Sequence, residues 1–135
     1  LPPGEFDKWV VQPIRRIVEN VKRNHPTIPI IGFPKGAGLN YELFAIETAV
    51  DAVSIDSTVP LEWVREKIQP NCAVQGNLDN VCLLEGGDEL KRNIDEILNT
   101  LSNGRFIFNL GHGVLPETPV SHVNYLIERV RNSSE

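Results

Sequence analysis

The chain has 135 residues, of which 41% are hydrophobic, so it can bury one core, and we predict a single domain over residues 1–135. Its 18 acidic and 13 basic residues give a net charge of −5, which provides no general attraction to nucleic acid or anionic lipid, and we expect neither partner. No apolar run approaches the roughly 20 residues of a membrane-spanning helix, and two cysteines, Cys72 and Cys82, are too few for a disulfide framework. A reducing compartment, the cytoplasm, is the expected location.

The chain opens with a stretch of helical periodicity from about Glu5 to Arg23. We expect Pro13 to restart this helix, because proline fits a first helical turn but breaks a helix interior. The apolar residues at helical spacing predict a buried stripe formed by Ile14, Ile17, Val18 and Val21.

Short apolar runs and further helical stretches then alternate. The predicted strands run from Ile28 to Phe33, from Ala52 to Ile55, from Cys72 to Gln75 and from Phe106 to Leu110. The predicted helices between and after them run from Tyr41 to Thr48, from Leu61 to Ile68, from Asp88 to Leu101 and from Val120 to Arg129. Asp88 and Thr118 are the expected N-caps of the last two helices, with Pro119 in a first turn.

The order of these elements predicts an α/β fold with about four parallel strands alternating with helices. Each predicted strand is nearly all apolar, which is typical of strands covered by helices. Strand starts are separated by roughly 20 to 35 residues, as in a (β/α)₈ barrel of the TIM type. A closed barrel usually needs about 250 residues, so the chain supplies about half of one, and the two edges of its sheet would be bare.

Ligands of such sheets bind at the carboxyl ends of the strands, and here all four predicted ends are polar or glycine-rich. They read Phe33-Pro34-Lys35-Gly36-Ala37-Gly38, Asp56-Ser57-Thr58, Gly76-Asn77-Leu78-Asp79 and Asn109-Leu110-Gly111-His112-Gly113. The first segment could bind an anion, but it lacks the dinucleotide and P-loop spacings, so an ordinary turn is the favoured interpretation. The two aspartates could form an acid pair, although loop carboxylates more often cap helices or form turns.

His112 is the strongest candidate for an active-site residue, because it follows an apolar strand directly and glycines flank it. The alternative is a histidine whose two ring nitrogens only hold neighbouring loops. His25 and His122 are expected to be solvated. The histidines are far apart and no Cys-x-x-Cys is present, so we expect no metal site, and no nucleophile-elbow motif occurs.

Two motifs carry a family resemblance. They are Ala73-Val74-Gln75-Gly76-Asn77-Leu78-Asp79 and Phe108-Asn109-Leu110-Gly111-His112-Gly113, followed by Pro116 and Thr118-Pro119. Together they resemble the C-terminal part of the uroporphyrinogen decarboxylase family, and the resemblance covers essentially the whole chain. It implies a cytosolic, homodimeric lyase of haem and porphyrin biosynthesis. Such an enzyme decarboxylates the four acetate side chains of uroporphyrinogen to give coproporphyrinogen, without cofactor or metal.

The resemblance also implies roles for individual residues. His112 corresponds to a family histidine that contacts substrate and helps to position a carboxylate or a proton. Gln75, Asn77, Asp79 and Asn109 belong to the motifs and are expected to shape loops or to support the site, as is Lys35. The family's arginine motif, its pyrrole-binding aspartate and its tyrosine and serine contacts would precede Leu1. A substrate with eight carboxylates needs cations, and near the strand ends this chain offers only Lys35. Asn80 stands where the family usually has proline, a difference that is expected to affect a turn.

Two alternatives remain open at this point. The first is a corrinoid-dependent methyltransferase, a related family that binds zinc through a His-x-Cys element and another cysteine. Phe33-Pro34-Lys35 and Gly111-His112-Gly113 stand at the corresponding positions, so the expected zinc ligands are missing. The second is a non-catalytic, truncated half-barrel. The chain begins at Leu1 and contains no methionine, so we expect it to be cut from a longer protein. By itself it should show little or no turnover and should associate through its bare sheet edges.

Overall fold

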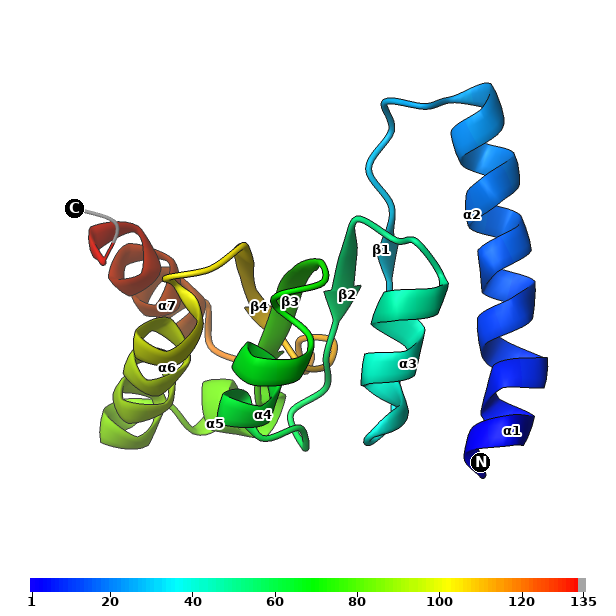
Figure 1. Ribbon diagram of the computed structural model, residues 1–135. Coiled ribbons are helices and arrows are strands. Elements are labelled where there is room, and N and C mark those ends of the chain that lie inside the picture. Colours follow the sequence, from blue (N-terminus) through cyan, green and yellow to red (C-terminus); the bar gives the residue numbers. More distant parts are fainter. Residues whose placement is uncertain (134–135) are drawn as a thin grey trace.

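The computed structural model describes residues 1–133, which form an α/β structure around one parallel sheet (Figure 1). The strands are β1 (Ile31–Gly32), β2 (Ala52–Ser54), β3 (Ala73–Leu78) and β4 (Phe106–Leu110). Their order in the sheet, β1-β2-β3-β4, is their order in the chain, and all three neighbouring pairs are parallel. A doubly wound sheet reverses its order at a switch point, whereas a barrel does not. The predicted half-barrel with four parallel strands is therefore confirmed.

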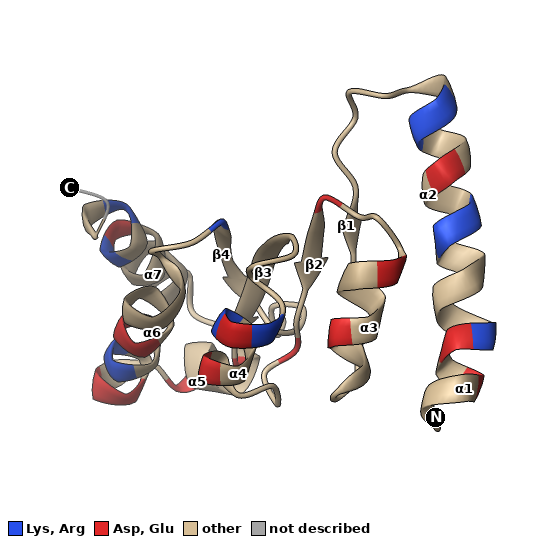
Figure 2. Ribbon diagram, in the orientation of Figure 1, with Lys and Arg blue, Asp and Glu red and all other residues tan. Residues whose placement is uncertain are grey.

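Helices precede, connect and follow the strands. They are α1 (Pro3–Phe6), the π-helical turn η1 (Asp7–Val11), α2 (Gln12–Asn24), α3 (Asn40–Glu47), α4 (Leu61–Lys67), α5 (Asn80–Glu85), α6 (Gly87–Leu101) and α7 (Val120–Asn132). In Figure 1, α2 and α3 stand at one end of the molecule, α6 and α7 at the other, and the strands lie between them. Charged residues lie mainly on the helices (Figure 2). Among residues 1–133, none of the helices combines the length and the apolar character needed to cross a membrane.

The first helical stretch is continuous from Pro3 to Asn24 but changes its winding just before Pro13. Pro13 is the second residue of α2 and lies in its first turn, as predicted, and only Gln12 separates it from the π-helical turn Asp7–Val11. Proline has no N–H to donate to the preceding turn, so the wider winding there costs no hydrogen bond that an α-helix would have made. The interpretation of Pro13 as a restart is confirmed.

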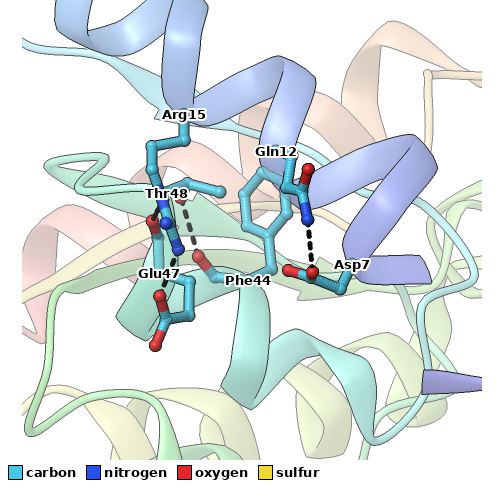
Figure 3. Close-up of polar contacts among 6 residues, drawn as sticks. All are labelled: Asp7, Gln12, Arg15, Phe44, Glu47 and Thr48. Carbon is cyan, nitrogen blue, oxygen red and sulfur yellow. Dashed lines mark hydrogen bonds and ion pairs between the residues drawn. The ribbon is translucent and has the colours of Figure 1, made fainter. Parts of the chain in front are cut away.

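The core lies between the sheet and the helices that cover it. Val53 and Val74, paired across β2 and β3, are both fully buried. α3 contributes Phe44 to this core. Figure 3 shows how α2 is attached to α3: the Arg15 guanidinium donates to the backbone oxygen and to the carboxylate of Glu47. The sheet and its helices are therefore one packed unit.

Two predicted strands differ from the structure by several residues, while the end of the second strand and the start of the third differ by one residue each. The first strand was expected from Ile28 to Phe33, but β1 has only two residues, because this edge strand has a ladder partner on one side alone among the described residues. The third was expected to end at Gln75, but β3 continues to Leu78, because β4 pairs with it along its whole length. Pairing with a distant segment, which local sequence does not report, decided both limits.

The predicted caps and one buried stripe were also wrong. α6 begins after Gly86, so Asp88 lies inside its first turn, and α7 begins after Pro119 without a side-chain bond from Thr118. Of the predicted stripe of α2, Val18 is buried, but Ile17 is 57% exposed. This part of α2 lies along the β1 edge of the sheet, beside an apolar groove of about 260 Å³. A further helix, α5, went unpredicted, because six residues are too few to display a helical period.

Candidate active site

The candidate site lies at the carboxyl ends of the strands, where the loops after β1, β2 and β4 meet. Lys35 and His112, which stand 77 residues apart, are in direct contact there through the Lys35 Nζ and His112 Nε2 atoms. Both side chains are exposed. The structure thus brings together the strongest site residue of the sequence and the lysine nearest to a strand end.

The His112 loop is held by its neighbours rather than by the imidazole. Gly111 donates its N–H to the Leu78 oxygen at 2.8 Å and packs so tightly against the loop after β2 that an added Cβ would lie 2.4 Å from the Ser57 nitrogen. A side chain there would collide with backbone, so the position requires glycine. Asn80 donates from Nδ2 to the Gly113 oxygen at 2.9 Å. These contacts fix the loop and leave the His112 Nε2 atom facing Lys35.

The second ring nitrogen of His112 has a partner in its own loop. The backbone N–H of Gly113 donates to His112 Nδ1 at 3.0 Å. Nε2 is in contact with Lys35 Nζ, so both ring nitrogens have a partner, and the tautomer decides which of them carries the proton of a neutral imidazole.

Asp56 is the buried polar centre of the site, with 6% of its surface exposed. Its Oδ2 accepts from the Gly36 N–H at 2.9 Å and from the Tyr41 hydroxyl at 2.8 Å. Its Oδ1 accepts from the backbone N–H and from the hydroxyl of Thr58. Asp56 therefore ties the loop that carries Lys35 to α3 and to the loop after β2.

These contacts change the acidity of both buried groups. Burial raises the pKa of Asp56, but the hydrogen bonds from Thr58, Gly36 and Tyr41 outweigh it and lower the pKa to about 2. Burial also raises the pKa of Tyr41, and its hydrogen bond to the Asp56 carboxylate raises it further. At neutral pH, Asp56 is a carboxylate and Tyr41 a neutral donor. The favoured interpretation of Asp56 as a turn former is confirmed.

Two other motif residues, Asn77 and Gln75, form hydrogen bonds with β2 and the loop that follows it. Asn77 is buried, and its Nδ2 donates to the backbone oxygens of Asp56 and Val59 at 3.0 and 3.1 Å. Gln75 donates to Ser54 Oγ at 3.2 Å across β2 and β3. Both side chains are thus engaged with the strands and the loop after β2.

Asp79 and Asn109 make only local contacts. Asp79 is the N-cap of α5, because its Oδ1 accepts from the Val81 N–H at 2.7 Å, which confirms the helix-cap interpretation. Asn109 is exposed, and its Oδ1 accepts from the N–H of the next residue, Leu110, at 2.8 Å. Neither contacts His112 or Lys35 through a side-chain hydrogen bond within residues 1–133.

The remaining histidines and cysteines lie away from the site. His25 is exposed, as expected, but His122 is not simply solvated: its Nδ1 lies 3.0 Å from the Leu83 oxygen, because α7 packs over α5. Cys72 and Cys82 are buried, which raises the pKa of both thiols and makes them poor nucleophiles. Within residues 1–133, no group of three or more His, Cys, Asp or Glu side chains is arranged to hold a metal ion.

Sequence reasoning missed two residues of the site. Tyr41 was predicted only as the start of a helix, and its role depends on contact with Asp56, 15 residues away. Asn80 was expected to affect a turn, whereas its side chain reaches the loop after β4. Its position directly after a motif was the one local signal that it could have a role.

Comparison with known proteins identifies close relatives. The family model for uroporphyrinogen decarboxylase (URO-D) matches residues 1–133. Curated proteins named uroporphyrinogen decarboxylase from Rhodospirillum rubrum, Sphingopyxis alaskensis and Rickettsia bellii are 50%, 47% and 48% identical to the chain, and each alignment covers 97% of it. The chain spans 38% of the length of each of these relatives. These matches favour the decarboxylases over the corrinoid-dependent methyltransferases.

Proposed function

We propose that a protein carrying this chain decarboxylates uroporphyrinogen, because the chain belongs to the uroporphyrinogen decarboxylase family. The reaction removes the carboxylates of the four acetate side chains and gives coproporphyrinogen. Protonation of a pyrrole ring creates an electron sink, the bond to the carboxylate breaks, and CO₂ leaves. A second proton completes the new methyl group, and the ring releases the proton that it had taken up. The chemistry needs groups that bind carboxylates and groups that guide protons.

The observation that carries the proposal is the position of His112. It follows β4 at the carboxyl ends of the strands, its Nε2 faces Lys35, and its loop is held by Gly111 and Asn80. We assign it contact with the substrate, where its imidazole would bind a carboxylate or guide a proton. Gln75, Asn77 and Asp79 would keep the surrounding strands and loops in place.

Charge supports the same role. Eight carboxylates on the substrate require cations, whereas the chain has a net charge of −5. Lys35 is the only lysine or arginine in the loops that directly follow the four strands. The chain spans 38% of its relatives' length, so the remaining charge compensation is assigned to the rest of the protein. The 135 residues alone should give little or no turnover.

The test is turnover of uroporphyrinogen by the complete protein and by its His112→Asn variant. We expect the wild type to form coproporphyrinogen and the variant to lose activity by about 10- to 100-fold, a usual loss when a positioned donor is removed. Folding should be retained, because His112 is exposed on a loop. His25→Asn is the matched control, since His25 is exposed at the end of α2. A wild-type protein without turnover would contradict the proposed function, and wild-type kinetics in His112→Asn would remove His112 from the site.

Assembly and location are part of the same proposal. We expect a cytoplasmic homodimer, as in the family that the chain resembles. In the isolated chain, Ile31 in β1 and Phe33 directly after it are 45% and 46% exposed, and such apolar edges favour association. Sedimentation should therefore detect oligomers of the chain, and a stable monomer at high concentration would contradict this expectation.

A further inference from the structure

We propose that Lys35 and His112 together bind one carboxylate of the substrate, and that this carboxylate is one that remains in the product. The inference rests on the proposed function and adds Lys35 to the substrate-binding residues. Four observations carry it: the donors that meet at the site, the absence of a protein anion for Lys35, the way in which its loop is held, and the chemistry of decarboxylation.

The contact between Lys35 Nζ and His112 Nε2 joins a permanent cation to an imidazole. The Gly113 N–H donates to His112 Nδ1 and Lys35 Nζ contacts Nε2, and the tautomer decides which ring nitrogen carries the proton of the neutral ring. A lysine ammonium has three N–H donors and no acceptor. The imidazole can use at most one of these donors, so a carboxylate placed between the two side chains can accept from the ammonium with one oxygen and, when the ring proton lies on Nε2, from the imidazole with the other.

No protein carboxylate fills that place among residues 1–133, where Lys35 forms no ion pair. The nearest acid of the adjoining loop, Asp56, is already saturated, because its two oxygens accept four hydrogen bonds from Gly36, Tyr41 and Thr58. Within residues 1–133, Lys35 is thus a cation at the strand ends without a carboxylate partner.

The loop of Lys35 is fixed while its side chain remains free to move. Asp56 holds the Gly36 N–H, and the Ala37 N–H donates to the Pro34 oxygen at 3.0 Å. The exposed lysine has a flexible four-carbon stem, so Nζ can swing away from Nε2 to admit a carboxylate without moving the backbone. Asp56 is therefore a positioning residue, which acts on the substrate through the loop that carries Lys35.

The chemistry indicates which carboxylate is bound. Loss of CO₂ breaks the carbon–carbon bond to the carboxylate, moves its electron pair into the ring system and removes the negative charge from the carboxylate oxygens. Donors on that carboxylate would therefore stabilise the ground state more than the transition state. Such a pair would slow the reaction if it held the reacting acetate. On a carboxylate that stays, the same pair binds substrate and product alike and orients the ring.

The experiment compares the complete protein with its Lys35→Met and Lys35→Arg variants, with Lys67→Met as the matched control on the exposed end of α4. KM for uroporphyrinogen and kcat are measured, together with the affinity for added coproporphyrinogen. Lys35→Met should raise KM and weaken product binding by the same factor, about tenfold, as expected for one lost charge-assisted hydrogen bond. kcat should stay close to wild type, because the lost interaction binds the ground state and the transition state equally. Lys35→Arg should recover most of the affinity, and Lys67→Met should behave as wild type.

Three results would overturn the inference while leaving the proposed function intact. The first is a Lys35→Met variant whose KM and product affinity are unchanged. The second is a fall in kcat alone, which would mean that Lys35 only positions His112. The third is a change in KM without a change in product affinity, which would assign the pair to a reacting acetate. If the wild-type protein shows no turnover, the proposed function fails. The affinity for coproporphyrinogen then tests the inference by itself. Weaker binding of coproporphyrinogen by Lys35→Met than by the wild type supports carboxylate binding by Lys35 and His112, and equal binding overturns it.

Discussion

Strands β2 and β4 are both composed mainly of apolar residues, yet their surroundings differ. In β2 and the two residues after it, every residue from Ala52 to Asp56 is at most 6% exposed, whereas Ile107 in β4 is 44% exposed. β2 lies between β1 and β3, while β4 has β3 as its one neighbour among the described strands. The comparison shows that a strand's position in the sheet, and not its composition alone, decides how much of it is buried.

The outer strands of the sheet are partly exposed, and the chain is shorter than the relatives that it matches. The sheet has the sequential order of a barrel, and its outer strands carry apolar side chains that are half exposed. The chain spans 38% of the length of its relatives. The buried middle of the sheet should therefore dominate the stability of the isolated chain, and the edges should contribute little.

The largest expected effect contrasts two isoleucines. Ile55→Ala should lower the free energy of unfolding by about 3 kcal/mol, because Ile55 is fully buried and the change leaves a cavity. Ile107→Ala should cost less than about 1 kcal/mol, because much of that side chain is already in water. Urea denaturation of the chain measures both, and equal losses would break the comparison between β2 and β4.

A smaller effect is expected at the acid that follows β2. The pKa of Asp56 is about 2 in the folded chain against 3.8 ordinarily, so its ionised form contributes about 2 kcal/mol of stability. The folded-state pKa is the lower one, so the contribution is complete above about pH 4 and is lost as the pH falls towards 2. Asp56→Asn should remove it at neutral pH, because the amide nitrogen would face donors. Denaturant titrations between pH 2 and 7 should show a smaller pH dependence in the variant; parallel curves would refute the buried role of Asp56.

The smallest effect is expected at the acid that follows β3. Asp79 is exposed and caps the six-residue helix α5, so Asp79→Ala should cost about 1 kcal/mol, the usual loss for an N-cap. Asp79→Asn is the control, since asparagine caps a helix about as well as aspartate, and it should leave stability nearly unchanged. Thermal unfolding followed by circular dichroism suits both variants. A larger loss than in Asp56→Asn would reverse the predicted order of the two acids.

Much of the fold could be predicted from the sequence, because the signals are local. The alternation of apolar runs and helical periods predicted four strands and their helices, and the limits of β4 agree with the structure. The limits of β3 did not, because its last three residues form a strand only by pairing with β4. Helix α5 was missed because it is short, and the caps of α6 and α7 because side-chain caps are absent there.

The site was predicted in part. His112 and Lys35 were each singled out from their place after an apolar strand, but nothing local indicated that they touch. Asp56 was recognised as a turn former, while its link to Tyr41 and Gly36 was not foreseen. His122 was misjudged for the same reason, since its partner Leu83 belongs to another helix.

The sequence by itself determined the half-barrel, its family and the candidate histidine, because periodicity, strand length and short motifs are properties of neighbouring residues. Only the tertiary structure decided which loops meet, which acid is saturated with hydrogen bonds and which lysine the histidine contacts. Those properties depend on side chains that stand 15 to 77 residues apart in the chain and approach only when the parallel strands align their carboxyl ends.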